Sequence, residues 1–174
     1  MAFALKGLAD LNADDLTELC SAQAPESEHL DFKEDLSKKR GDDPWRSRRE
    51  LAEAASNALL EHVVGFANAH GGRVVVGVRE TADKPSRAGS LQPLPDCHDL
   101  AERLLQVASG VITPQIPRLR ARGIDLGAGG VGAVIIDIPE SPLAPHRLER
   151  TRRCYVRRGT RTEELTMREI QDLT

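Results

Sequence analysis

Residues 65–80, GFANAHGGRVVVGVRE, decide the fold, because here the end of a helix meets a strand that must be buried. The Gly71-Gly72 pair stops the helix, since glycine adopts the left-handed backbone at a helix end without steric cost. The run from Arg73 to Val78 is short, β-branched and bounded by glycines, which predicts a buried strand. Glu80 follows at the exit of this strand and adds a carboxylate there.

Residues 26–33, ESEHLDFK, form the second informative segment. Side chains alternate across a strand, so Asp31 and Lys33 point to the same face. An extended chain would separate Glu26 from Asp31 by about 16 Å, and a turn at Glu26-Ser27 is therefore required to bring them together. Carboxylates at strand ends, with a lysine beside them, are able to hold a divalent cation against a phosphodiester.

A second interpretation of the same segment involves no ligand. Glu26 and Ser27 would then only turn the chain, and Asp31 and Lys33 would form an ion pair that contributes little. Asn68 also has two interpretations. It either ends the helix as a C-cap residue, which we favour, or binds backbone or orients a carboxylate beside the glycine turn.

Together with the last part of the chain, these segments resemble the Schlafen-type AlbA-like (AlbA-2) domain family. The shared pattern begins with E-S-x-x-x-(E/D)-F-K, which is followed by a helix. The motif F-A-N-x-x-G-G-x comes next, and after it a hydrophobic run leads to G-V-x and an acidic residue. The pattern continues with Pro145-His146, residues 154–162 (CYVRRGTRT) and residues 167–170 (MREI). The resemblance covers the chain from about Glu26 to Leu173.

The resemblance implies a nucleic-acid-binding domain over residues 25–174, preceded by an N-terminal helical extension over residues 1–24. A chain of 174 residues is sized for one such domain with a real core. Helices and strands alternate at first and strands then follow one another, which predicts a single α/β domain with a mixed β-sheet flanked by helices.

The residue patterns predict the following elements. In the first half of the chain they are a helix from Asn12 to near Cys20, a strand at 29–34, a loop at 37–43, a long helix from Pro44 to Gly71 and a strand at 73–78. Arg46, Arg48 and Arg49 lie in the opening turns of the long helix. The second half is predicted to contain a loop at 81–95, a helix from Asp96 to Ala108, a hairpin of 116–125 and 131–138, a peripheral strand at 152–158 and a final helix after Thr166. Residues 127–130 are predicted to be the hairpin turn, and nucleotide binding by the glycine-rich run 127–132 is the less favoured alternative.

By resemblance, three carboxylates and one lysine match the positions of the metal-dependent site of RNA-cleaving Schlafen proteins. Glu26, Asp31 and Glu80 would bind Mg²⁺ or Mn²⁺, and Lys33 would lie close to the scissile phosphate, so that all four are candidate catalytic residues. Those proteins typically have Glu in place of Asp31 and Asp in place of Glu80, so both side chains differ here by one methylene. The implied activity is an endonuclease, with RNA or tRNA favoured over DNA on family grounds.

Charge is distributed unevenly along the chain despite a net charge of -3. Nine acidic residues accompany Lys33 between Asp10 and Asp35, whereas the segment from 147 to 161 is rich in arginine. Such a segment favours an anionic partner. The candidate nucleic-acid contacts are Arg147, Arg150, Arg152, Arg153, Tyr155, Arg157, Arg158 and Arg161. Alternatively, these arginines pair with Glu163, Glu164 and the acidic N-terminal region, or form a protein interface.

Two other function classes therefore stay open. One is a non-catalytic DNA- or RNA-binding regulatory module, and the other is an adaptor that docks a partner protein or a second copy of itself. The sequence contains no signal peptide and no membrane-spanning stretch, and we expect a cytoplasmic protein without membrane contact.

Isolated histidines and cysteines give weaker indications. Cys20, Cys97 and Cys154 are odd in number and far apart, which predicts reduced structural thiols. The pair Cys97-His98 has no further soft ligand at zinc spacing, so the sequence excludes a metal site there. His62 and His70 are expected to be structural, whereas His146 has a weak link to substrate.

Overall fold

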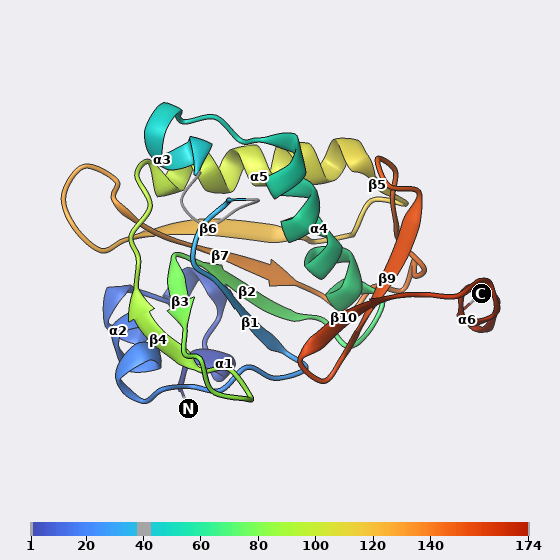
Figure 1. The fold of residues 1–174 in the computed structure, drawn as a ribbon, viewed down its shortest axis with the longest axis horizontal. Coiled ribbons are helices and arrows are strands. Elements are labelled where there is room, and N and C mark those ends of the chain that lie inside the picture. The colour runs from blue at the N-terminus through green and yellow to red at the C-terminus, as the bar shows by residue number, and fades with distance from the viewer. Residues whose placement is uncertain (1, 38–42, 174) are drawn as a thin grey trace.

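The computed structural model describes residues 2–37 and 43–173 (Figure 1). Its helices are α1 (Ala2–Leu5), the 3-10 turn η1 (Leu8–Asp10), α2 (Ala13–Ser21), α3 (Pro44–Arg48), α4 (Glu53–Ala67), α5 (Cys97–Val111) and α6 (Met167–Asp172). Its strands are β1 (Leu30–Lys33), β2 (Gly72–Val76), β3 (Val78–Glu80), β4 (Ala88–Leu91), β5 (Ile112–Thr113), β6 (Arg120–Asp125), β7 (Gly132–Ile138), β8 (Arg147–Leu148), β9 (Arg153–Arg158) and β10 (Arg161–Glu164).

A mixed four-stranded sheet with the order β1-β2-β7-β6 lies at the centre. Strand β1 runs parallel to β2, with Leu30 opposite Arg73 and Lys33 opposite Val76. The pairs β2–β7 and β7–β6 are antiparallel, and the second is the predicted hairpin. The predicted fold class, one α/β domain with a mixed sheet and flanking helices, is confirmed.

The central strands divide the core into two clusters because their side chains alternate. Val74 and Val76 face α4 and α5 and belong to the larger cluster, which also contains Trp45. Val75 and Phe32 face the opposite side, where α1, α2, β3 and β4 contribute the covering side chains. Figure 1 shows α4 and α5 together above the sheet and α1, α2, β3 and β4 at its lower left.

A second sheet, β10-β9-β8-β5, packs beside α4 and is antiparallel throughout. Gly65 in α4 allows this close approach, because a Cβ atom there would lie 3.0 Å from Cγ2 of Thr162 and 3.4 Å from the backbone carbon of Val156. The final helix α6 begins at the predicted capping box, in which Thr166 and Glu169 exchange hydrogen bonds. It projects from the body in Figure 1 and has no buried residue.

The N-terminal segment is helical, as expected, and it packs onto the sheet. Asn12 caps α2 through a capping box with Asp15, which satisfies backbone N–H groups at the helix start. Arg122 on β6 donates hydrogen bonds to the carbonyls of Leu8 at 2.9 Å and Leu11 at 3.0 Å. Within the described residues, none of the helices is long and apolar enough to cross a membrane.

The long helix predicted from Pro44 to Gly71 is wrong, because the structure contains two helices. Arg49 ends α3 in a left-handed conformation with φ of 58°, and α4 begins only at Glu53. The Arg49 guanidinium donates to the carbonyl of Trp45 at 3.0 Å, and the buried Trp45 ring is fixed by an Nε1 hydrogen bond of 2.7 Å to Pro95. Arg46, Arg48 and Arg49 therefore do not belong to the helix that follows.

Smaller corrections concern the segments around the strands. The predicted loop at 81–95 contains strand β4, which pairs with β3. Asp96 stands before α5 as predicted, but it makes no side-chain cap and instead pairs with Arg49. The predicted strand at 152–158 is confirmed as β9 but carries buried residues, including Cys154. The loop expected at 37–43 falls mainly on residues 38–42, which lie outside the described residues.

Candidate metal centre

Strand β1 provides two of the predicted site residues. Asp31 and Lys33 point away from the second core cluster, in which the Phe32 ring between them is fully buried. The Lys33 Nζ atom lies 2.8 Å from Oδ2 of Asp31. The two side chains therefore share a face of the strand, as the alternation predicts.

A tight turn returns Glu26 to this face. Ser27 and Leu30 exchange two backbone hydrogen bonds, of 3.0 and 3.4 Å, and the N–H of Glu26 donates to the carbonyl of Ser86 at 2.9 Å. The required turn therefore exists, although it spans residues 27–30 and lies one residue later than predicted. The hydrogen bond to Ser86 fixes Glu26 against the β3–β4 segment.

Glu80 reaches the site because β2 and β3 are separated by a bend. Gly77 adopts φ of 104°, a conformation that side chains other than glycine rarely adopt, and β3 then leads to Glu80. The Oε1 atom of Glu80 lies 4.0 Å from Nζ of Lys33.

Glu26, Asp31 and Glu80 converge, since each contributes one carboxylate oxygen to a group within 4.8 Å of one another. Asp31 is shorter and Glu80 longer by one methylene than is typical for the resembled proteins, and the oxygens still meet. The three line a cleft of about 640 Å³. Its other lining residues are Lys33, His62, Lys84, Pro85, Ser86, Thr160 and Arg161.

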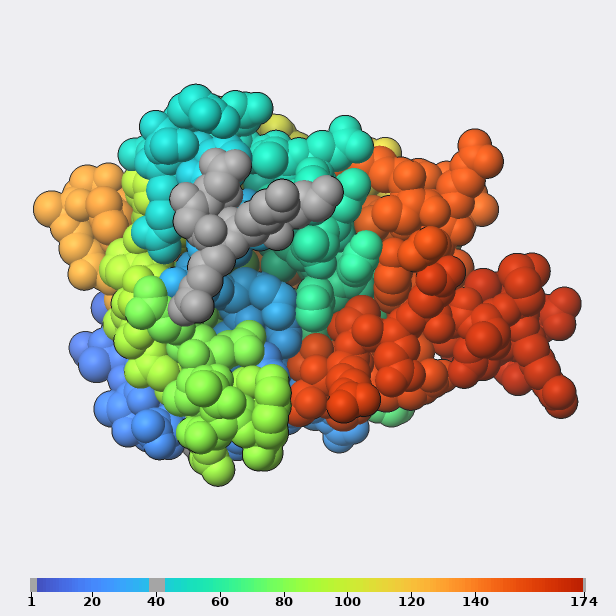
Figure 2. Space-filling model, in the orientation of Figure 1, coloured from blue at the N-terminus to red at the C-terminus, as the bar shows by residue number. Residues whose placement is uncertain are grey.

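Figure 2 shows where the walls of this cleft lie on the surface. The green β3–β4 segment and the red segment at β10 lie side by side on this face, and blue atoms are visible above the green ones, next to the teal atoms of α4. These segments contribute most of the lining residues, and α4 adds His62. Parts of the chain that are far apart in sequence therefore enclose the carboxylates.

Asp31 is the most buried member of the group, with a side chain only 2% exposed. Besides Lys33, its carboxylate contacts Nδ1 of His62 at 3.3 Å and Nη2 of Arg157 at 3.3 Å. Burial alone would raise the pKa of Asp31, but the charge of Lys33 foremost, with the His62 contact and a hydrogen bond from Glu26, lowers it. Asp31 is therefore ionised at neutral pH.

Glu26 behaves in the opposite way. Burial, the hydrogen bond to Asp31 and the negative charges of Asp31 and Glu80 raise the pKa of Glu26 to about 8. A pKa of about 8 favours the protonated form of Glu26 at neutral pH, the form that is able to donate a hydrogen bond to Asp31. Burial and the positive charge of Lys33 lower the pKa of His62 to about 4, so the imidazole is neutral.

The donor set fits a divalent cation with hard-ligand chemistry. Three carboxylates offer the oxygen ligands that Mg²⁺ and Mn²⁺ prefer, and the cleft leaves room for water molecules to complete the coordination. Burial foremost, and then the hydrogen bond to Asp31 and the nearby negative charges, raise the pKa of Glu26, and a bound cation would relieve the repulsion between those charges. We therefore take Glu26, Asp31 and Glu80 as the residues able to hold such an ion.

His62 is a further residue of the site that the sequence pattern did not identify. It was expected to be a structural histidine on the apolar side of the helix, yet it lines the cleft and contacts Asp31. Its Nδ1 atom also lies 3.1 Å from Oγ1 of Thr162 on β10. The sequence did contain an indication of this role. His62 is a polar residue on the buried face of a helix, and that helix packs beside a strand that carries a carboxylate.

The exposed arginines of the predicted nucleic-acid interface have mixed surroundings. Arg153 pairs with Glu164 at 3.3 Å and Arg158 with Glu163 at 2.9 Å, so part of the cluster forms the predicted internal ion pairs. Arg147 likewise pairs with Glu149, and Arg150 donates to Asn57. Arg161, by contrast, lines the cleft beside the carboxylates.

Tyr155 and Arg157 do not face outward, which corrects their assignment as nucleic-acid contacts. Tyr155 is buried, and its hydroxyl group donates to Oε1 of Glu61 at 3.0 Å. The Arg157 side chain is 0% exposed, lies over the Phe66 ring at 4.8 Å and donates to the carbonyl of Ser27 at 3.1 Å. Arg157 therefore supports Asp31 from the protein interior, whereas Tyr155 belongs to the larger core cluster.

Asn68 and His146 stabilise the junction between α4 and the second sheet. Asn68 occupies the C-cap position of α4, as favoured, and its side chain also binds backbone, the other interpretation. It accepts from the N–H of His146 at 2.6 Å and donates to the carbonyl of Tyr155 at 2.8 Å. His146 is fully buried against the carbonyl of Pro114, so it is not placed to touch a substrate.

Comparison with known proteins gives the family. The family model described as "Schlafen, AlbA_2" matches residues 26–166. No curated protein matches the chain.

Two solved structures resemble this one at low sequence identity. One is the solution NMR structure of the N-terminal domain of a protein described as ATP-dependent DNA helicase RecG-related, from Nitrosomonas europaea, with 18% identity, a TM-score of 0.45, and coverage of 75% of this chain and 74% of that chain. The other is the DIP2311 protein from Corynebacterium diphtheriae, with 18% identity, a TM-score of 0.51, and coverage of 86% of this chain but only 29% of that chain. The second supports the fold, and the family match extends over most of the sequence. The chain belongs to the Schlafen, AlbA_2 family.

Proposed function

We propose that this protein is a nucleic-acid-binding domain with a divalent-metal-dependent endonuclease site, acting on RNA in preference to DNA. The observation that carries this proposal is the convergence of Glu26, Asp31 and Glu80 within 4.8 Å in a cleft that also contains Lys33 and Arg161. Family membership supports the association with nucleic acid. The preference for RNA rests on the family resemblance.

Each side chain has a role that follows from its position. A Mg²⁺ or Mn²⁺ ion held by the three carboxylates would supply Lewis acidity toward a phosphodiester. Lys33, 27% exposed at its side chain, would neutralise charge on a phosphate oxygen as a point charge. The charge of Lys33 keeps Asp31 ionised, and its contact with the buried Arg157 holds it in place, which makes it the fixed ligand of the set.

The rim of the cleft favours a polyanion. Lys84 and Arg161 both line the cleft, the first from the β3–β4 segment and the second from β10. These two positive charges would position the phosphate backbone of a nucleic acid over the carboxylates. Contacts of this kind orient the nucleic-acid strand without recognising its base sequence. The low aromatic content of 3% supports a grip that is mainly electrostatic.

The test is a cleavage assay with labelled tRNA and with single- and double-stranded DNA, in Mn²⁺, Mg²⁺ or EDTA. The variants are Glu26→Gln and Glu80→Gln, since both residues are partly exposed and neither change removes the buried Asp31 carboxylate. Glu28→Gln is the matched control, because Glu28 is an exposed carboxylate outside the cleft. We expect metal-dependent cleavage that falls at least about 100-fold in both site variants and stays unchanged in the control.

A second candidate function is a non-catalytic DNA- or RNA-binding regulatory module. It is supported by the burial of Asp31 among three cationic or basic side chains, an arrangement that also serves as a structural ion-pair network. Salt-sensitive binding without cleavage in any metal would favour this module. A third candidate, a protein adaptor or homodimer, would have no measurable affinity for nucleic acid at moderate salt.

A further inference from the structure

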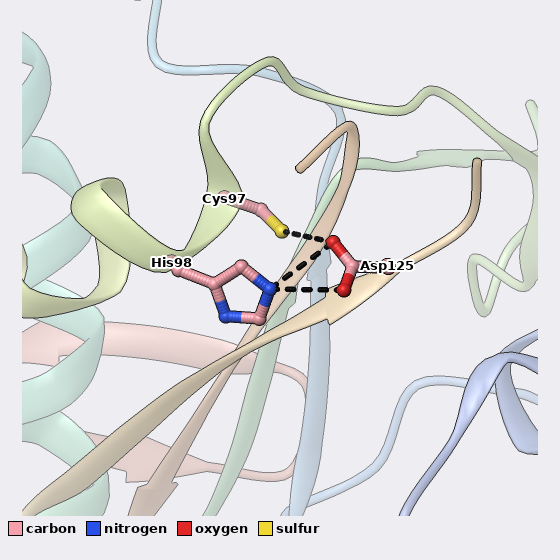
Figure 3. A group of neighbouring side chains, drawn as sticks. All are labelled: Cys97, His98 and Asp125. Carbon is pink, nitrogen blue, oxygen red and sulfur yellow. Dashed lines mark hydrogen bonds and ion pairs between the residues drawn. The ribbon is translucent and has the colours of Figure 1, made fainter. Parts of the chain in front are cut away.

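A second group of side chains that are able to ligate a metal lies outside the cleft, at the start of α5. Figure 3 shows Cys97 and His98, from the first turn of α5, pointing toward Asp125 at the end of β6. One ligand atom from each residue lies within 4.8 Å of the other two. The pair Cys97-His98 has no further soft ligand at zinc spacing in the sequence, and only the fold brings Asp125, 28 positions from Cys97, to it.

We infer that Cys97, His98 and Asp125 form a Zn²⁺ site with one open coordination position. A thiolate, an imidazole and a carboxylate are the three ligand types that Zn²⁺ combines in proteins, and three protein ligands leave a position for water. A mixed set of this kind is unsuited to Mg²⁺ or Ca²⁺, which require oxygen ligands alone. The site is therefore chemically distinct from the carboxylate cleft.

The observed distances are close to those of a tetrahedral zinc centre. With Zn–N and Zn–O bonds of about 2.05 Å and Zn–S of about 2.3 Å, tetrahedral angles place N and O about 3.3 Å apart and S and O about 3.6 Å apart. Nε2 of His98 lies 3.1 Å from Oδ1 of Asp125, and Sγ of Cys97 lies 3.9 Å from the same oxygen. Both distances to the carboxylate oxygen are therefore within a few tenths of an ångström of these values, and the sulfur and the imidazole nitrogen lie within 4.8 Å of each other.

Backbone hydrogen bonds hold the two halves of the site together before any ion binds. Leu94 and Gly132 exchange hydrogen bonds of 2.6 and 2.8 Å, and the N–H of Cys97 donates to the carbonyl of Gly130 at 2.9 Å. Glycine is required for this approach. A Cβ atom on Gly123 would lie 2.7 Å from the backbone of Cys97, and one on Gly132 would lie 3.0 Å from the Cys97 sulfur.

The solvent exposure of the site and the orientation of His98 favour a metal site over a catalytic Cys-His pair. His98 and Asp125 are 57% and 53% exposed at their side chains, so an ion is able to enter from solvent, while the sulfur closes the inner side. A catalytic Cys-His pair is not supported, because His98 directs Nε2 to both oxygens of Asp125 at 3.1 Å. Burial raises the pKa of the Cys97 thiol to about 11, so an ion must displace the proton there.

The test uses Co²⁺ as a spectroscopic probe and Zn²⁺ as a competitor. A thiolate-to-cobalt charge-transfer band reports sulfur ligation and does not arise from the carboxylate cleft. We expect the purified protein to develop this band with one equivalent of Co²⁺, and Zn²⁺ to abolish it. His98→Asn and Asp125→Asn, both at exposed positions, should each weaken Zn²⁺ binding by at least about tenfold.

The controls separate this site from the rest of the molecule. Cys97→Ser should remove the band, whereas Cys20→Ser and Glu80→Gln should keep it. If Cys97→Ser does not fold, the two exposed variants decide the question alone. Absence of the band in the unaltered protein, its survival in Cys97→Ser, its loss in Cys20→Ser, or unchanged Zn²⁺ affinity in His98→Asn and Asp125→Asn would each overturn the inference.

Discussion

Replacing Arg157 with methionine should destabilise the protein because it removes the buried partner of Asp31. The Arg157 side chain is 0% exposed, that of Asp31 is 2% exposed, and Nη2 and Oδ1 lie 3.3 Å apart. Methionine keeps much of the packing against the Phe66 ring, so the change tests the charge more than the volume.

The expected magnitude follows from opposing contributions. Breaking a buried ion pair by removing one partner destabilises a protein by about 3–5 kcal/mol, since a buried charge is left uncompensated. Two features reduce this value here. Lys33 remains 2.8 Å from the Asp31 carboxylate, and Nε and Nη1 of Arg157 are buried without a hydrogen-bond partner among the described residues, so their removal relieves a penalty of about 1 kcal/mol or more. We expect a loss of about 2 kcal/mol in the free energy of unfolding.

A double-mutant cycle isolates the pair. Asp31→Asn, Arg157→Met and the double variant are unfolded in urea with EDTA present, and Trp45, the single tryptophan and fully buried, reports unfolding by fluorescence. We expect a coupling energy of about 2 kcal/mol, within the range measured for contacting residues. Arg158→Met is the control, because this exposed arginine forms surface ion pairs worth at most about 1 kcal/mol. A coupling energy below about 0.5 kcal/mol would refute the buried ion pair.

Two further predictions concern pH and salt. The pKa of His62 is about 4 in the folded state, below its ordinary 6.5, so its contribution to stability is present above pH 6.5 and lost as the pH falls toward 4. When the pH falls from 7 to 5, the free energy of unfolding of the metal-free protein, measured in urea, should decrease by about 1–2 kcal/mol more than that of the His62→Gln variant. Equal decreases in the two proteins would contradict this prediction. If Arg161 contacts phosphate at the cleft, Arg161→Gln should reduce the slope of log K against log salt for single-stranded RNA by about 0.7, whereas Arg120→Gln, on the outer strand β6, should not. Equal slopes in both variants would show that Arg161 makes no such contact.

The sequence predicted the central sheet because its signals are local. The β-branched run after Gly71-Gly72, the hairpin before Ile138 and the capping boxes at Asn12 and Thr166 all depend on neighbours within a few residues. The break after Arg48 could not be predicted in the same way. It depends on Arg49 binding Asp96 and on Trp45 binding Pro95, and both partners lie about fifty positions away.

The candidate site was predicted only in part for the same reason. Resemblance and strand alternation identified Glu26, Asp31, Lys33 and Glu80. Neither of them indicated that Arg157 points inward. Arg157 lies on β9 of the second sheet, and the residue pattern of that strand does not reveal which of its faces packs on α4. The contact of Asp125 with Cys97 and His98 could likewise not be predicted from the sequence, since only the fold of the β6–β7 hairpin brings Asp125 to these two residues.

The convergence of the three carboxylates on one divalent cation is tested most directly by Mn²⁺ binding. Titration of the metal-free protein at pH 7 by calorimetry, with electron paramagnetic resonance to count free Mn²⁺, should give one bound ion. Glu26→Gln and Glu80→Gln should each weaken that binding at least about tenfold, while Glu28→Gln leaves it unchanged. Equal Mn²⁺ affinity in the unaltered protein and both site variants would contradict the account.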